Sequence, residues 1–141
     1  MYYTTLNDAA TITDILSKGS VKVYYKAYEY TTAGTGAVQE IISQSCTRGV
    51  KALRGHFGEY AAEFVKVYLE QTHVCLGEIK GSDNVDDIAY VLQGEVWSPE
   101  GEARNIIRSK NLSHTSMSIG DIVEMPNGDL FLFDIGGMAK L

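Results

Sequence analysis

Residues 20–31, SVKVYYKAYEYT, form the stretch that decides the fold. They are rich in Val and Tyr, which favour strands over helices. Side chains alternate between the two faces of a strand, which predicts one mainly apolar face made of Val21, Val23, Tyr25 and Ala27. The opposite face would carry Lys22, Tyr24, Lys26 and Tyr28. An apolar face has to be buried against other elements, which the rest of the sequence must supply.

Residues 118–137, SIGDIVEMPNGDLFLFDIGG, predict a C-terminal β-hairpin. The turn Pro126-Asn127-Gly128 suits a type I turn followed by a glycine in the left-handed region, which closes a three-residue loop. The two strands would run from Ile122 to Met125 and from Leu130 to Ile135. We expect this hairpin and the Tyr-rich strand to lie in one mainly antiparallel sheet.

Helical patterns lie between these strands. Asn7 can cap a helix that ends near Lys18. An amphipathic helix is predicted by the spacing of its apolar residues, which are Val50, Leu53, Phe57, Ala61, Phe64 and Tyr68. Glycines interrupt the pattern, and we expect a break near His56. We also expect a strand at residues 73–79, a short helix at residues 85–92, and a helix from Ser98-Pro99 to Asn111.

These elements predict an α+β fold, because the strands are too few and too unevenly spaced for a doubly wound parallel sheet. Several helices would pack on a small, mainly antiparallel sheet that ends in the C-terminal hairpin. The length of 141 residues fits one domain, residues 1–141, and no repeat or linker marks a boundary. Within it, residues 1–70 hold the Tyr-rich strand and the long helix, and residues 71–141 hold the hairpin.

Composition and charge exclude several classes of protein. Hydrophobic residues make up 45% and charged residues 21%, which is typical of a globular chain. No apolar run is long enough to span a membrane and the start has no signal-peptide pattern, so we expect a soluble protein of the cytoplasm. Residues 1–70 carry seven acidic and seven basic side chains, whereas residues 71–141 carry eleven acidic and five basic ones. An acidic half binds nucleic-acid backbones poorly and suits a basic patch on another protein.

The cysteines and histidines give no sign of a metal site or of another cofactor, and we expect neither. Cys46 and Cys75 belong to no C-x-x-C pair, which predicts two reduced, mostly buried thiols. His73 and Cys75 could supply two metal ligands, but the sequence offers no third or fourth.

Three groups of residues could carry function. Lys22, Tyr24, Lys26 and Tyr28 resemble a platform on which single-stranded bases stack, one alternative reading. A small enzyme with a pocket near Trp97, His114 and Asp121 is a second alternative, although no G-x-S-x-G motif raises a serine there and no catalytic residue is assigned. A positively charged cluster is formed by Arg48, Lys51, Arg54 and His56.

Two segments also carry a family resemblance: QGEVWSPEGEAR at residues 93–104 and LSHTSMSIGDIV at residues 112–123. They are similar to small uncharacterised proteins of bacteriophages and bacterial plasmids, which read QGE-x-WSP-x-GEAR and then HTSMS-[VI]-GD. The apolar strand and hairpin that follow resemble those of YodL-like domains. The resemblance implies an accessory protein of a mobile element that works in the cytoplasm of a bacterial host.

We therefore expect a non-catalytic module that binds and modulates a host or phage protein. A nucleic acid is not the expected partner, and a homo-oligomer is left open. The expected binding surface lies on the two resemblance segments and consists of Glu95, Trp97, His114, Ser116 and Asp121. Trp97 itself is predicted to be buried, at the corner before the Ser-Pro helix start.

Overall fold

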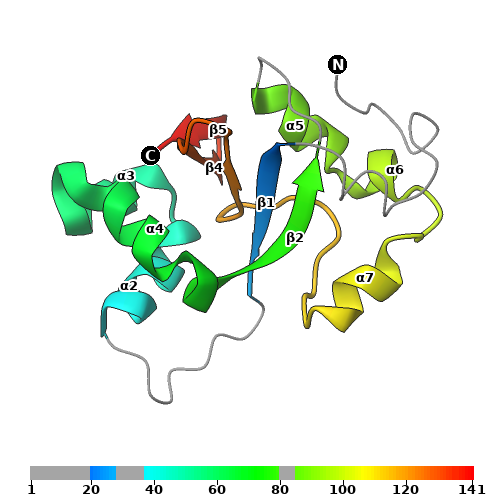
Figure 1. Ribbon diagram of the computed structural model, residues 1–141, viewed down its shortest axis with the longest axis horizontal. Coiled ribbons are helices and arrows are strands. Elements are labelled where there is room, and N and C mark those ends of the chain that lie inside the picture. Colours follow the sequence, from blue (N-terminus) through cyan, green and yellow to red (C-terminus); the bar gives the residue numbers. More distant parts are fainter. Residues whose placement is uncertain (1–19, 28–36, 80–84) are drawn as a thin grey trace.

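The computed structural model describes residues 20–27, 37–79 and 85–141 (Figure 1). The predicted helix at residues 7–18 lies outside the described residues, as does Tyr28 at the end of the Tyr-rich strand.

One antiparallel sheet joins the two halves of the chain, in the order β2-β1-β3-β4-β5. Its strands are β1 (Val21–Lys26), β2 (His73–Ile79), β3 (Ile122–Glu124), β4 (Leu130–Asp134) and β5 (Gly137–Lys140). Strand β1 lies between β2 and β3, and its Tyr24 pairs with Cys75 on one side and Ile122 on the other. The predicted α+β fold, with the Tyr-rich strand and the C-terminal hairpin in one antiparallel sheet, is confirmed.

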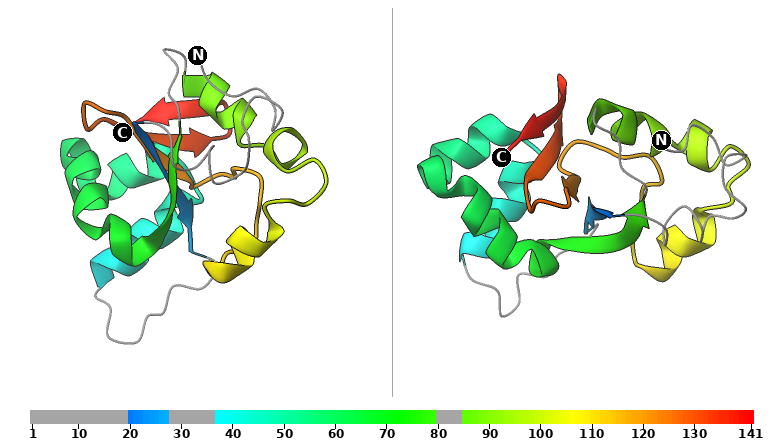
Figure 2. Two further views of the ribbon diagram at one scale, coloured as in Figure 1. Left: turned by 45° about the vertical axis from the view of Figure 1, so that its right-hand side comes forward. Right: turned by 45° about the horizontal axis from the view of Figure 1, so that its top comes forward.

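Helices cover both faces of this sheet (Figures 1 and 2). One face packs against α2 (Ala37–Cys46), α3 (Val50–Phe57) and α4 (Ala61–Thr72), and the 3-10 helix η2 (Gly58–Tyr60), which has no buried residue, joins α3 to α4. The other packs against α5 (Val85–Val91), α6 (Gly94–Trp97) and α7 (Arg104–Ser109). No helix in the described part of the chain is long and apolar enough to cross a membrane.

The alternation in β1 places its side chains in two different apolar clusters. Val21, Val23 and Tyr25 pack with α5, α6 and α7, whereas Tyr24 packs with α2, α3 and α4. The same division holds in β3, where Ile122 and Val123 belong to opposite clusters. The sheet is therefore buried on both faces along its middle strands.

The C-terminal tail forms one strand more than expected. The predicted turn is present: Gly128 has φ 92°, its N–H donates to the Met125 carbonyl, and the Met125 N–H donates to the Asp129 carbonyl, each at 2.8 Å. Beyond β4 the chain turns again, and β5 pairs with β4 from Phe131↔Lys140 to Asp134↔Gly137. The tail is thus a three-stranded meander, and the prediction of a simple hairpin is corrected.

The predicted break near His56 is present as η2, and it changes which residues face the core. The continuous pattern placed Phe64 inside, but Phe64 is 38% exposed, and Val65 and Leu69 are buried instead. The 3-10 turn has three residues per turn, so it rotates the buried face of α4 relative to that of α3. The prediction of one continuous apolar face along α3 and α4 was therefore wrong for α4.

The helix expected to begin at Ser98-Pro99 begins at Arg104. A turn takes its place: the Ser98 hydroxyl accepts a hydrogen bond from the Ala103 N–H at 2.9 Å. Asn111 has φ 56° just beyond the end of α7, as expected of a left-handed residue there.

Candidate functional site

The two resemblance segments lie against each other, and hydrogen bonds join the second segment to the start of the first and to the residue before it. The Met117 N–H donates to the Leu92 carbonyl at 3.0 Å, and the Gly94 N–H donates to the Ser116 hydroxyl at 2.6 Å. Trp97 is 0% exposed, and its indole N–H donates to the Thr115 carbonyl at 3.1 Å. The prediction that Trp97 is buried is confirmed, and its one polar atom is satisfied inside the protein.

Tyr25 joins the same network from β1, an interior strand of the sheet. Its hydroxyl donates to the Thr115 carbonyl at 2.7 Å, and its ring stacks on the imidazole of His114, with centroids 4.7 Å apart and planes at 13°. Burial, and secondly the Asp121 carboxylate, raise the pKa of Tyr25 well above its usual value, so its hydroxyl stays protonated as a donor.

Asp121 is the buried charge at the centre of this region, and its side chain is 1% exposed. One carboxylate oxygen accepts from the Lys26 N–H at 2.7 Å. The other accepts from the Ser118 N–H at 2.8 Å and from the His114 Nε2–H at 2.9 Å. Three donors compensate the carboxylate, which holds the end of β1 to the turn before β3.

His73 provides a second buried link to that turn. A carbonyl only accepts, so His73 Nε2–H donates to the Gly120 carbonyl at 2.8 Å, and Nδ1 accepts from the Thr72 hydroxyl at 2.8 Å. Burial lowers the pKa of His73 to about 4, against the opposing effects of the Gly120 carbonyl and Asp121. At neutral pH His73 is therefore an uncharged, structural side chain.

The structure brings together four of the five residues of the expected binding surface. Trp97, His114, Ser116 and Asp121 share the network described above, and most of their polar atoms bond within the fold. Glu95 lies apart: it is exposed on α6 and has no hydrogen bond or ion pair with another described residue. This geometry suits a scaffold that positions two loops, and no serine in the described part of the chain forms the hydrogen bond to His114 that nucleophilic catalysis requires.

The positively charged cluster lies on and beside α3. Arg48, Lys51, Arg54 and His56 are all exposed, and the Arg54 guanidinium donates to the Lys140 carbonyl in β5 at 3.0 Å. The Lys/Tyr face of β1 is less open than expected. Tyr24 is 8% exposed, so its ring has no free face on which a base could stack.

Two surface features were missed from the sequence. The first, which we call the α4 stripe, is a hollow of about 450 Å³ lined by Tyr60, Glu63, Phe64, Val67 and Tyr68. The sequence hid it because the unbroken helical pattern assigned Phe64 and Tyr68 to the core. Val67 could have given a signal, since it lies outside that pattern.

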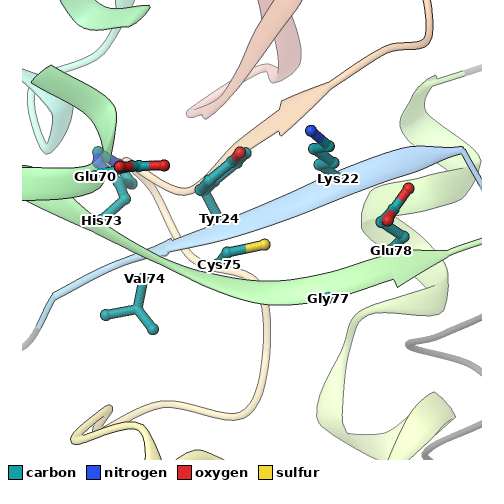
Figure 3. Close-up of a pocket in the computed structure, with 8 residues that line it drawn as sticks. All are labelled: Lys22, Tyr24, Glu70, His73, Val74, Cys75, Gly77 and Glu78. Carbon is teal, nitrogen blue, oxygen red and sulfur yellow. The ribbon is translucent and has the colours of Figure 1, made fainter. Parts of the chain in front are cut away.

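The second feature, which we call the β2 hollow, has a volume of about 630 Å³ and lies over β1 and β2 beside the end of α4 (Figure 3). Tyr24, Glu70, Cys75 and Glu78 are among the side chains that line it. Cys75 is exposed there, which corrects the prediction of two buried thiols, and Cys46 alone is buried. Burial raises the pKa of Cys46 to about 12, so that thiol is not a reactive one.

Comparison of the chain with protein-family models, with curated proteins and with solved structures gives no match.

Proposed function

We propose that this protein is a small phage or mobile-element accessory protein, a non-catalytic module that binds and modulates a host or phage protein through the α4 stripe. The exposed apolar residues of that stripe carry the proposal. The accessory role rests on the resemblance of residues 93–104 and 112–123 alone.

The α4 stripe groups large, exposed apolar side chains next to one another on the surface. Tyr60, Phe64 and Val67 follow one another at helical spacing and are 58%, 38% and 70% exposed. The Phe57 ring stacks on Phe64, with centroids 4.7 Å apart, and extends the apolar surface towards α3. Single exposed apolar residues are ordinary, whereas contiguous ones mark interaction sites.

The composition of the stripe also fits a protein partner. Aromatic side chains are enriched at the energetic centres of protein interfaces, because they bury a large area at little cost in entropy. Glu63 lines the same hollow and gives it one charged border. The resemblance segments offer fewer exposed side chains to a partner, because Trp97 and Asp121 are buried in the fold.

The test is capture of partners from a bacterial lysate with immobilised protein, quantified by mass spectrometry. Val67→Glu places a charge in the stripe and should lower the recovery of a specific partner at least tenfold. Ile135→Glu is the matched control, since Ile135 is also an exposed aliphatic residue, at 86%, but belongs to the turn between β4 and β5 and does not line the hollow of the α4 stripe.

Equal recovery by the parent and Val67→Glu, with both proteins folded, would refute the role of the α4 stripe. Loss of recovery in both variants would show that any added charge disturbs binding, and it would refute the site as well.

A further inference from the structure

The two edge strands of the sheet, β5 and β2, differ in whether another element covers them. At β5 the edge is covered: the Met138 N–H donates to the Asp86 carboxylate of α5 at 2.9 Å. At β2 no strand in the described ranges pairs on the outer side, although β2 has seven residues, more than any other strand. An uncovered edge strand presents unpaired N–H and C=O groups to which another strand can add.

The ladder shows which groups of β2 point outwards. The Ala27 N–H donates to the Thr72 carbonyl opposite it, and in antiparallel pairing such bonded pairs alternate with non-bonded ones. Tyr25 and Val74 are then a bonded pair, and Tyr24 and Cys75 a non-bonded one. The N–H and C=O of Cys75 therefore point away from β1, towards the open edge.

The β2 hollow lies directly beside that edge. Figure 3 shows the Tyr24, Cys75 and Glu78 side chains on one side of the two strands and Val74 on the other. A strand added to β2 would point alternate side chains to the same side, into or across the hollow. The added strand would thus gain both backbone hydrogen bonds and a side-chain site.

Two groups in the hollow lack partners. Tyr24 is 8% exposed, and no group in the described part of the chain forms a hydrogen bond with its hydroxyl. Glu70, on the α4 wall, forms no ion pair with a described residue, whereas Glu124 pairs with Lys66 at 3.6 Å. A hydroxyl that faces a hollow and has no partner in the described part of the chain is available to water or to a ligand.

The field in the hollow favours a cation. Lys22 is the one basic side chain of the lining that is charged at neutral pH, since burial lowers the pKa of His73 to about 4. The sheet register places Lys22 opposite both Glu78 and Glu124. Burial raises the pKa of Tyr24, and Cys75, Glu124, Glu70 and Glu78 raise it further by their charge. The hydroxyl is therefore a neutral group in negative surroundings, with Glu70 uncompensated.

We propose that an extended segment of a partner protein adds to the open edge of β2 and inserts a Lys or Arg side chain into the β2 hollow. There Glu70 compensates the positive charge, and the Tyr24 hydroxyl accepts a hydrogen bond from it. A second copy of this chain does not fit, because β2, with the sequence HVCLGEI, has no Lys or Arg to insert. The site is separate from the α4 stripe and does not rest on it.

Fluorescence anisotropy with three labelled peptides tests the proposal. The first is acetyl-Thr-Val-Thr-Arg-Thr-Val-Thr-amide, the second has Glu in place of Arg, and the third is the Arg peptide with alternate backbone amides methylated. We expect the Arg peptide to bind at least tenfold more tightly than either of the others. Equal affinity for the Arg and Glu peptides would overturn the cation site, and an unchanged affinity after methylation would overturn strand addition.

Variants locate the site on the protein. Glu70→Gln should weaken binding of the Arg peptide at least fivefold, and Tyr24→Phe should weaken it about twofold to fivefold, as loss of one hydrogen bond predicts. Glu59→Gln changes an exposed carboxylate of η2 that lines neither hollow, and it should leave the affinity unchanged. An unchanged affinity in Glu70→Gln, or a concentration-dependent dimer that the Arg peptide does not dissociate, would refute the proposal.

Discussion

Around Asp121 three donors meet one buried carboxylate, whereas the Tyr24 hydroxyl and the exposed Glu70 carboxylate form no hydrogen bond or ion pair within the described residues. The first region carries the two segments of the family resemblance, and the second lies outside them. The comparison teaches that the polar groups of a conspicuous motif can all form hydrogen bonds within the fold and hold loops together, which leaves few of them for a partner. Binding sites are then better sought where apolar side chains are exposed, on the α4 stripe, or where polar groups lack partners among the described residues, in the β2 hollow.

The largest expected effect is in the motif region. Trp97→Ala removes a fully buried ring and its hydrogen bond to Thr115, and should lower the free energy of unfolding by about 3–5 kcal/mol. Urea denaturation measures this, with Tyr90→Ala, an exposed aromatic, as the control. A variant that kept the parent's stability but lost its partner would instead make Trp97 a binding residue.

His73 gives an expected pH dependence in the same region. Its pKa is about 4 in the folded protein and about 6.5 when unfolded, so only the unfolded chain gains a proton between these values. The stabilisation is present above pH 6.5 and is lost as the pH falls towards 4, up to about 3 kcal/mol. Denaturation at a series of pH values measures it, and His73→Gln should flatten the curve. An equal slope in that variant would assign the pH dependence to other groups.

Asp121→Asn should have a somewhat smaller effect, about 2–3 kcal/mol, because the amide NH₂ faces at least one of the donors that the carboxylate accepted. The control is Glu95→Gln, which changes an exposed carboxylate of the same predicted surface. A folded Asp121→Asn protein that no longer captured its partner would return the binding role to that surface.

The smallest effect is expected on the other side of the comparison. Val67→Ser should change the free energy of unfolding by less than about 0.5 kcal/mol, since Val67 is 70% exposed. Thermal and urea denaturation check this. A large destabilisation would show that the α4 stripe packs within the molecule and is not a docking surface.

Local sequence patterns predicted much of the sheet. Residues 73–79 and the turn at Gly128 follow from alternation and turn chemistry, which act over a few residues. The exposure of Cys75 did not follow, because it depends on β2 being an edge strand, and that is decided by strand order. Nor did the short strand β5, whose Gly-rich start gives no strand signal.

The candidate sites were predicted less well for a related reason. The sequence placed Ser116 and Gly94 in two motifs that lie close along the chain. It could not show that the Ser116 hydroxyl accepts a hydrogen bond from the Gly94 N–H within the fold. The α4 stripe depends on a three-residue change of helix type at η2, which shifts every later side chain around the axis. Glycines signalled that break, but the direction of the resulting shift required the packed structure.

The position of β1 has a consequence for synthesis of the chain. Lys22 of β1 pairs with Glu124 of β3, about 100 residues later. The second neighbour of β1 therefore exists only after β3 has been synthesised. Until then only β2 can pair with it, and a two-stranded ribbon is marginally stable on its own. A nascent chain that stalls before residue 122 therefore presents an apolar, Tyr-rich strand to chaperones and to other chains, and synthesis of β3 is what gives β1 its second neighbour.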